Sequence, residues 1–434
     1  MKKHFSLLLI CFLSVSIFLM GCATVNVNNQ ENTSNNNQTN DQGNVESEEQ
    51  VELVMYSWRA EDREAYEVFI EKFESIHPNI RVKFEPFQST EYNTILNNAL
   101  VSGTGPDIVQ LRPYQGAASV ADSDYLVPLE GVPGLDEINE DFLDAAKGSD
   151  GKVYGVPLAL NAGVIFFNKD IFEEHHLEVP ETWGEFLEVS DKLNAAGVVP
   201  IAQSGRAAYV LSLVHGVIAP PAYNGNEFVE EILAGSADLK DARFVESVNR
   251  MKQLEQYFPK DFIALDDQDA QRMFYSEQAA MYINGSYRLE TFESNIPDMN
   301  LGVIPSLAEE KGGNAPVTTW VDGSYGVVKN TKHQEEALLF MEFLASQEFG
   351  QLFADELNRL GAINGVNPSH PIVNEIAAAV EKESTPYLLL VHFGDGSPTT
   401  KTVFEDHLQG MYLGELSPQE VIEEAQKNAD RASE

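Results

Sequence analysis

Residues 51–58 read Val51-Glu-Leu-Val-Met-Tyr-Ser-Trp58, a short apolar run of residues with high β-propensity, and they predict a strand. Apolar residues then recur at helical spacing from Tyr66 to Ile76, and Pro78 marks the end of that helix. Residues 80–85 alternate apolar and charged side chains. Because this period of two is typical of a half-buried strand, we expect a second strand there.

The next segment repeats this order of elements. Apolar residues from Tyr92 to Leu100 have helical spacing, Gly103-Thr-Gly-Pro-Asp107 predicts a turn, and Ile108-Val-Gln-Leu111 predicts a third strand. Strand, helix, strand, helix, strand is the pattern of βαβ units. The sequence therefore predicts an α/β fold with a mainly parallel sheet.

Capping signals predict further helices. Thr182 and Glu185 match a capping box at the start of a helix that we expect to end at Ala196 before Gly197. Residues 243–257 and 335–349 are helical by period, and Ser417-Pro-Gln-Glu420 predicts a last helix.

The first 50 residues predict export and anchoring. Lys2 and Lys3 precede an uncharged apolar run that ends in Leu19-Met-Gly-Cys22, and this sequence resembles a bacterial lipobox. The resemblance implies a signal peptide at 1–21 and a diacylated Cys22, with two chains for stable anchoring. An uncleaved anchor is the alternative. Residues 22–50 are polar and predict a disordered tether.

Composition excludes several classes of protein. With 434 residues the chain is long enough for two or three lobes, and its formal net charge of -40 disfavours nucleic acid as a partner. Cys11 and Cys22 are the only cysteines, so removal of the signal would leave no disulfide, cysteine–zinc site or second thiol. We also expect a monomer.

Catalytic and metal motifs are absent from the sequence. It contains no HExxH, Walker loop or G-x-S-x-G, and His175-His176 fits a solvated helix end. Asp266-Asp-Gln-Asp269 lacks the glycine and distal glutamate of an EF-hand and favours an acidic surface turn. We therefore predict a binding protein with no cofactor and no metal. A glycosidase or lyase remains an alternative because 68 acidic residues always offer a carboxylate pair.

Several segments in a fixed order carry a family resemblance. They are Tyr56-Ser-Trp58, His77-Pro-Asn-Ile80, Gly103-Thr-Gly-Pro-Asp-Ile-Val109, Asp150-Gly-Lys-Val-Tyr-Gly-Val-Pro157, Phe167-Asn-Lys-Asp-Ile-Phe172, Pro180-Glu-Thr-Trp183, Glu277-Gln-Ala-Ala-Met281 and Asn284-Gly-Ser-Tyr287. From about Val51 onward, the chain resembles an extracellular solute-binding protein of ABC importers, of the carbohydrate-binding type that includes maltose-binding protein.

This resemblance implies a two-lobe periplasmic-binding-protein-like fold with a ligand cleft and a hinge of crossover strands. On this mapping the N-terminal lobe comprises 51–156 and about 306–353, and the C-terminal lobe about 157–305 and 354–434. The first crossover matches Tyr154-Gly-Val-Pro157, and a second is expected near Val303-Ile-Pro305.

The implied function is delivery of a mono- or oligosaccharide to ABC permease subunits from the outer face of the cell membrane, by hinge closure over the solute. A polyamine, a sugar phosphate or another small solute is the alternative with the same fold. A sensor that docks on a receptor is a further possibility.

The first candidate ligand contacts lie in loops that follow the expected strands of the N-terminal lobe. A sugar site pairs aromatic rings with planar polar groups, and ligands of open α/β sheets bind at the carboxyl ends of strands. Trp58, Asp107, Arg112 and Tyr114 meet these conditions, although each also has a structural interpretation.

The remaining candidates follow the first expected crossover. Asn161 aligns with an acidic ligand-binding residue of relatives, and Tyr287 stands where many relatives carry a stacking tryptophan. Trp320 and Asp322 form an aromatic–carboxylate pair in Thr-Thr-Trp-Val-Asp-Gly. We expect these residues to line the cleft.

Overall fold

The computed structural model describes residues 50–394 and 396–432, with no side chain described for Thr90. The expected signal peptide, Cys22 and all of the expected tether except Gln50 lie outside the described residues. Residues 49–434 form one compact unit. Within the described part of the chain, no helix is both long and apolar enough to cross a bilayer.

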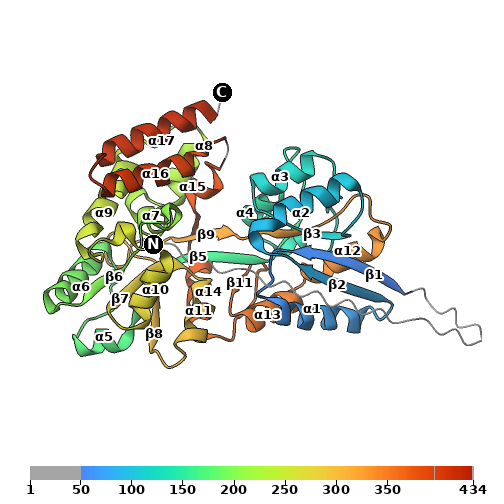
Figure 1. Ribbon diagram of the computed structural model, residues 1–434, viewed down its shortest axis with the longest axis horizontal. Helices are drawn as coiled ribbons and strands as arrows, with labels where there is room; N and C mark the ends of the chain where they lie inside the picture. Colours follow the sequence, from blue (N-terminus) through green and yellow to red (C-terminus); the bar gives the residue numbers. More distant parts are fainter. Residues whose placement is uncertain (1–49, 395, 433–434) are drawn as a thin grey trace, which may run out of the picture. The chain divides into compact units, whose positions relative to one another are not determined.

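Strands and helices are distributed along the whole described chain (Figure 1). The strands are β1 (Val51–Ser57), β2 (Ile80–Pro86), β3 (Ile108–Leu111), β4 (Val156–Pro157), β5 (Ala159–Asn168), β6 (Val199–Ala202), β7 (Ala279–Gly285), β8 (Leu301–Ile304), β9 (Val317–Val321), β10 (Ser324–Val327), β11 (Leu360–Gly361) and β12 (Ser384–Pro386). The α-helices are α1 (Arg63–Ile76), α2 (Ser89–Ser102), α3 (Gln115–Asp122), α4 (Glu140–Leu143), α5 (Lys169–Glu174), α6 (Trp183–Ala196), α7 (Ala208–Tyr223), α8 (Asn226–Leu233), α9 (Ala242–Leu254), α10 (Asp267–Tyr275), α11 (Arg288–Asn295), α12 (Gln334–Leu344), α13 (Gln347–Leu357), α14 (Pro371–Lys382), α15 (Leu388–Val391), α16 (Thr400–Tyr412) and α17 (Pro418–Ala432). Short 3-10 helices are η1 (Leu135–Glu137), η2 (Asp144–Ala146), η3 (Glu255–Tyr257) and η4 (Phe262–Ala264).

The first sheet has the strand order β2-β1-β3-β10-β4. β1 pairs in parallel with β2 and β3, as the pattern of 51–111 predicts, while β10 runs antiparallel to β3 and β4. Helices cover both faces of this sheet. On one face α1, α12 and α13 pack against residues such as Leu53 and Met55. On the other face α2 and α3 pack against Val109 and Leu111. The central strand β3 is therefore buried on both sides, whereas the edge strand β2 leaves Lys83 exposed.

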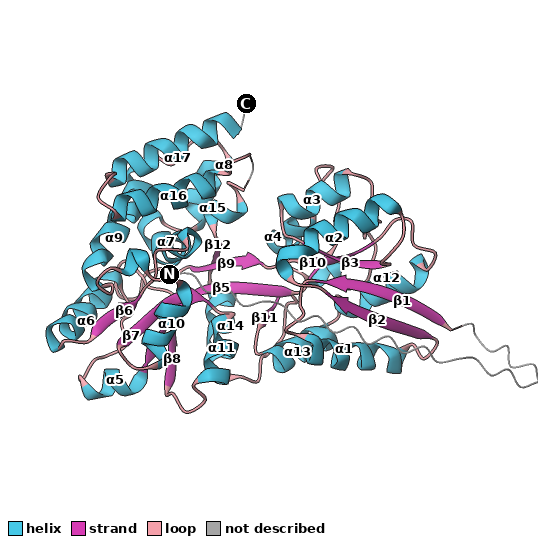
Figure 2. Cartoon of the chain, viewed as in Figure 1, coloured by secondary structure: helices cyan, strands magenta, loops and turns pink. Residues whose placement is uncertain are grey.

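The second sheet is centred on β5 (Figure 2). Its strand order is β12-β9-β5-β7-β6, and β8 and β11 also pair with β5. Alternate residues of β5 point to opposite faces: Val164 and Phe166 pack with α10, α11 and α14, whereas Ile165 and Phe167 pack with α6, α7, α9 and α16. β5 thus has helices on both faces, and its antiparallel partners come from distant parts of the chain.

The chain passes between the sheets at three places. β4 belongs to the first sheet and β5 to the second, so the first passage lies at 157–159, beside the expected Tyr154–Pro157. β9 ends in the second sheet at Val321 and β10 begins in the first at Ser324. The expected second passage near Val303–Pro305 differs from this position, because β8 pairs with β5 inside the second sheet. β11 returns the chain to β5 after α13.

Local capping explains where several helices begin and end. The Thr182 hydroxyl accepts from the Glu185 N–H, and Gly197 ends α6 in the left-handed conformation, as predicted. Two predictions are wrong in detail. Residues 335–349 contain two helices, because Ser346 caps a new helix through the Phe349 N–H. Asp266 is not part of a surface turn: it caps α10 in a capping box with Asp269.

Candidate functional site

A cavity of about 660 Å³ lies where segments of the two sheets meet. Its walls come from the loop after β1, from β5 and the β9–β10 connection, and from α7, α11, α15 and α16. The lining residues are Arg59, Glu61, Ala159, Asn161, Tyr209, Leu213, Tyr287, Glu290, Thr291, Ser294, Asn295, Trp320, Asp322, Arg359, Tyr387, Leu390 and Lys401. Four aromatic rings face a set of hydroxyl, amide and charged groups, so the cavity offers both stacking and hydrogen bonding.

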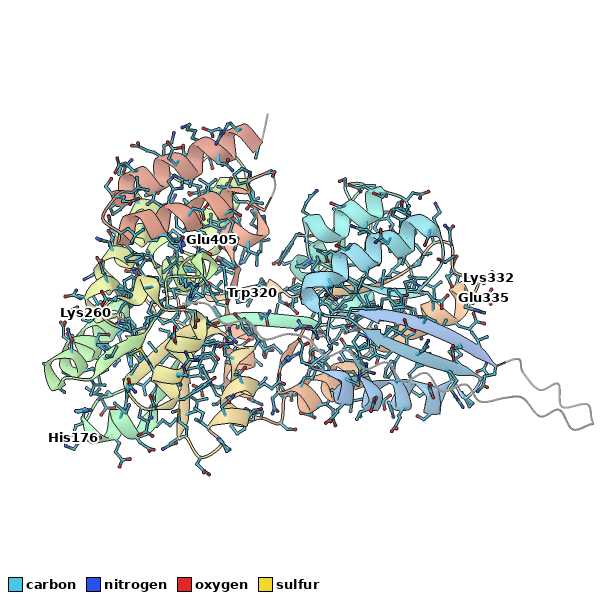
Figure 3. The ribbon with its side chains drawn as sticks, viewed as in Figure 1. His176, Lys260, Trp320, Lys332, Glu335 and Glu405 are labelled. Carbon is cyan, nitrogen blue, oxygen red and sulfur yellow. The ribbon has the colours of Figure 1, made fainter. Side chains whose placement is uncertain are left out.

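Strand register brings two of the lining side chains together. Asn161 of β5 and Trp320 of β9 are direct partners in an antiparallel pair. Directly opposite residues share one face of a sheet, so the amide and the indole project from the same side. Trp320 also packs edge-on against Tyr387 with ring centroids 5.7 Å apart, and Figure 3 labels it on β9. Directly after β9, the Asp322 N–H donates to the Ala159 carbonyl at 3.0 Å.

Tyr287 lies between the end of β7 and the start of α11. The Ser286 N–H before it donates to the Ala162 carbonyl at 2.7 Å, which attaches this turn to β5 beside Asn161. The Tyr287 hydroxyl donates to Asn284 Oδ1 at 2.8 Å. Burial raises the pKa of Tyr287, so the phenol is neutral near pH 7.

Each cation in the cavity wall has a carboxylate partner. Arg59 pairs with Asp322 and with Glu61. Arg359 pairs with Asp62 at 2.6 Å and with Glu290 at 2.5 Å. The third pair joins Lys401 to Glu405, which is buried on α16 and labelled in Figure 3. Every positive charge of the wall is therefore paired, so the wall offers no free cation to an anionic solute, and the five carboxylates around these three cations leave an excess of negative charge.

Among the described residues, no group of three or more His, Cys, Asp and Glu side chains is arranged to hold a metal ion. The cavity wall offers rings, amides, hydroxyls and paired charges to a solute.

Comparison with known proteins identifies the family. The model for bacterial extracellular solute-binding proteins matches residues 57–351. The chain belongs to this family. It is 25% identical over 326 residues to the multiple sugar-binding protein of Streptococcus mutans, an alignment that covers 74% of this chain and 77% of that protein. It is 24% identical over 341 residues to the galactooligosaccharide-binding protein of Bacillus subtilis, with 76% and 77% covered.

Solved structures show the same fold. The apo form of RafE from Streptococcus pneumoniae superposes with a TM-score of 0.75 at 21% identity, and covers 89% of this chain and 98% of its own. RafE in complex with raffinose superposes with a TM-score of 0.70 and covers 88% and 100%. This solute-binding protein therefore has the two-lobe fold of its family, with the cavity where segments of the two sheets meet.

Four of the eight residues predicted as ligand contacts line the cavity. They are Asn161, Tyr287, Trp320 and Asp322, and all four lie on or directly after strands of the second sheet. The structure carries no ligand, so their roles stay predictions. Asp322 differs from the other three because its carboxylate already pairs with Arg59.

The other four candidates are positioned away from the cavity wall. Trp58 is buried, packs edge-on against Tyr92, and carries the Arg112 guanidinium 4.0 Å above its ring. Arg112 also donates to Ser89. The Asp107 carboxylate accepts from the Val54 N–H at 2.8 Å and from the Thr331 hydroxyl at 2.5 Å.

Asp107 lines a separate cavity of about 230 Å³. Tyr114 is mostly buried, and its hydroxyl accepts from the Val321 N–H at 3.2 Å, which joins the loop after β3 to the β9–β10 passage. In this structure the four candidates outside the cavity wall stabilise loops through these contacts; they are Trp58, Asp107, Arg112 and Tyr114. Their contact with ligand stays a prediction.

Several cavity residues were not found from the sequence. Arg59 follows Trp58 and could have been included as the next residue after a strand. Tyr209 is the second residue of α7, the helix that follows β6. Arg359, Tyr387 and Lys401 come from the last quarter of the chain, where no repeating pattern indicates which residues approach the cleft.

Proposed function

We propose that this protein binds a neutral mono- or oligosaccharide in the 660 Å³ cavity and delivers it unchanged to the permease of an ABC importer. The composition of the wall carries the proposal. Aromatic rings suit the apolar C–H faces of a sugar, amides and hydroxyls suit its OH groups, and the paired charges leave no free cation for a phosphate. The streptococcal and Bacillus relatives are a multiple sugar-binding protein and a galactooligosaccharide-binding protein, which is consistent with a sugar.

Transport requires two states with different affinity for the sugar. A sugar that contacts both walls of the cavity binds the closed state better than the open state, so it shifts the population toward closure. We propose that the passages at 157–159 and 321–324 form the hinge, and that the permease binds the closed form. The second segment of the N-terminal lobe then starts at Ser324 rather than at about 306, because β9 pairs inside the second sheet, and the boundary at about 353 and 354 stays part of the proposal.

Anchoring is proposed from the sequence alone. Leu19-Met-Gly-Cys22 is the lipobox-like segment that would place a diacylglycerol on Cys22, with residues 22–50 as tether and the folded part as a monomer at the outer face of the membrane. Metabolic labelling with a palmitate analogue tests this, because a Cys22→Ala variant should lose the label.

Thermal denaturation of residues 23–434 with a panel of solutes tests the substrate class. The panel contains glucose, galactose, raffinose and galacto-oligosaccharides, with spermidine and glucose 6-phosphate as charged alternatives. A specific sugar at a hundredfold excess over Kd should stabilise the protein by about 2.7 kcal/mol. Chromatography should recover that sugar unchanged. Stabilisation by spermidine or the phosphate alone, or consumption of the sugar, would contradict the proposal.

The Lys401–Glu405 pair predicts selectivity for neutral over acidic sugars. Glu405 is buried, accepts from the Ser212 hydroxyl at 2.6 Å and neutralises Lys401, which lines the cavity. Glu405→Gln keeps an acceptor for Ser212 but removes the neutralising charge. We expect binding of a uronic acid sugar to strengthen roughly tenfold relative to its neutral counterpart, as measured by calorimetry.

Glu424→Gln is the matched control for this substitution. It removes the partner of Lys427 within α17, at 3.0 Å, away from the residues of the cavity wall. The ratio of affinities for acidic and neutral sugars should stay at its wild-type value. If the ratio of affinities changes equally in the two variants, the charge of Lys401 does not affect the binding of the sugar.

A further inference from the structure

The Tyr287 ring is held from three sides. Its hydroxyl donates to Asn284 Oδ1 at 2.8 Å. One side of the ring lies against Gly285, since a Cβ at Gly285 would overlap Cε1 and Cδ1 of the ring. The Arg288 guanidinium lies 5.2 Å from the ring centroid, in range of a cation–π contact. A tyrosine fixed in this way loses little side-chain entropy when a solute stacks on it.

The groups that hold the ring are themselves joined below the wall of the cavity. Asn284 Nδ2 donates to the Tyr282 hydroxyl at 2.8 Å, and that hydroxyl donates to Asp267 Oδ1 at 2.6 Å. Asp267 Oδ2 pairs with Arg288. The contacts therefore form a closed circuit. It begins with the hydrogen bond of the Tyr287 hydroxyl and ends with the contact between the Arg288 guanidinium and the Tyr287 ring.

Most of this circuit is out of reach of a solute. Asn284 and Tyr282 are buried at 0% and 1% exposure, and Asp267 is 9% exposed. None of the three lines the cavity. Asp267 also accepts from Gln271 Nε2 at 2.8 Å, so both its oxygens are satisfied. A buried hydrogen-bonded network of this kind fixes the geometry of its members, although Nε of Arg288 has no hydrogen-bond partner.

We propose that Tyr282, Asn284, Asp267 and Arg288 form a positioning circuit for Tyr287, through which buried residues of β7 and α10 set the affinity of the cleft for its sugar. This inference rests on the proposed function. It explains why the first residue of α10, a strand tyrosine and a strand amide are joined beneath one aromatic ring. It also explains why residue 285 is glycine, because any side chain there would displace the ring.

Tyr282→Phe tests the circuit, since it removes one hydroxyl and two hydrogen bonds at a residue that does not line the cavity. With raffinose, or the panel sugar that binds in its place, we expect Kd to rise about tenfold by calorimetry. In the Tyr287→Ala background the same substitution should change Kd less than twofold, because its effect passes through the ring.

The matched control is Tyr325→Phe. Tyr325 is equally buried, and its hydroxyl makes two bonds of 2.9 Å, to Ser57 and Tyr66, in the first sheet. Both variants should lower the melting temperature, but the control should keep its Kd within twofold of wild type. Equal Kd changes in the two variants, or an undiminished effect of Tyr282→Phe without the Tyr287 ring, would overturn the inference.

A measurement without sugar separates this inference from the proposed function. In protein labelled with 3-fluorotyrosine, the Tyr287 resonance is the one that disappears in Tyr287→Phe. Tyr282→Phe should shift or broaden that resonance, whereas Tyr325→Phe should leave it unchanged. If no sugar of the panel binds wild-type protein, the proposed function fails, and this spectrum still decides whether the circuit holds the ring.

Discussion

Replacing Tyr287 by alanine should weaken sugar binding about 30- to 1,000-fold, the range expected when an aromatic residue at the centre of a binding site is truncated. The ring lies in the wall between β5, β7 and α11, and its position is set before any solute enters. Alanine removes both the stacking surface and the hydroxyl partner of Asn284. Calorimetry with the sugar that stabilises wild-type protein gives the ratio of Kd values.

Two further substitutions define what the ring contributes. Tyr287→Phe keeps the ring and loses the bond to Asn284, so we expect a smaller rise in Kd than with alanine. Tyr125→Ala removes a partly buried tyrosine beside the separate 230 Å³ cavity and should leave Kd within twofold of wild type. Wild-type affinity in Tyr287→Ala would place the sugar elsewhere.

The local part of the fold could be predicted from the sequence. The structure reproduces the strands and helices predicted at 51–111 and the helix caps predicted at Thr182 and Ser417. These features depend on interactions between residues that are close in the sequence. The break at Ser346 was missed because apolar spacing continues across it, although a serine cap begins a new helix there.

Non-local pairing could not be predicted in the same way. β5 pairs with β9 more than 150 residues later, and no period in either strand indicates the register that places Asn161 opposite Trp320. The family resemblance supplied Asn161 instead, and Trp320 was a candidate through its aromatic–carboxylate pair with Asp322. For Asp267 the local pattern gave a wrong prediction. The acidic run indicates a solvated turn, yet in the structure this carboxylate is buried and contacts Tyr282 and Arg288.

The same limit applies to the charges of the cavity. Arg359 and Asp62 are 297 residues apart in the chain, and only the fold brings them together. Asp62 occupies the N-cap position of α1, where an aspartate usually accepts from the helix N–H groups, but it makes no such bond. Its carboxylate accepts hydrogen bonds from Arg359 instead.

Arg359→Ala should therefore destabilise the protein by about 3–5 kcal/mol, the cost of leaving a buried charge without its partner. The Asp62 side chain is 2% exposed and accepts two hydrogen bonds from Arg359, at 2.6 and 3.0 Å. Burial lowers the pKa of Arg359, but the charges of Asp62 and Glu290 outweigh burial and raise it, so the guanidinium stays charged. Urea titration of the folded fluorescence signal measures the loss.

A second substitution distinguishes the destabilisation caused by the unpaired charge from the destabilisation caused by lost packing. Asp62→Asn in the Arg359→Ala background removes the uncompensated carboxylate, so we expect it to recover at least about half of the lost stability. Glu290→Gln removes the other partner of Arg359, which is 44% exposed, and should cost less than about 1 kcal/mol. If Arg359→Ala costs as little as Glu290→Gln, then Asp62 must find another donor, either the N–H groups of α1 or Arg59 at 3.9 Å.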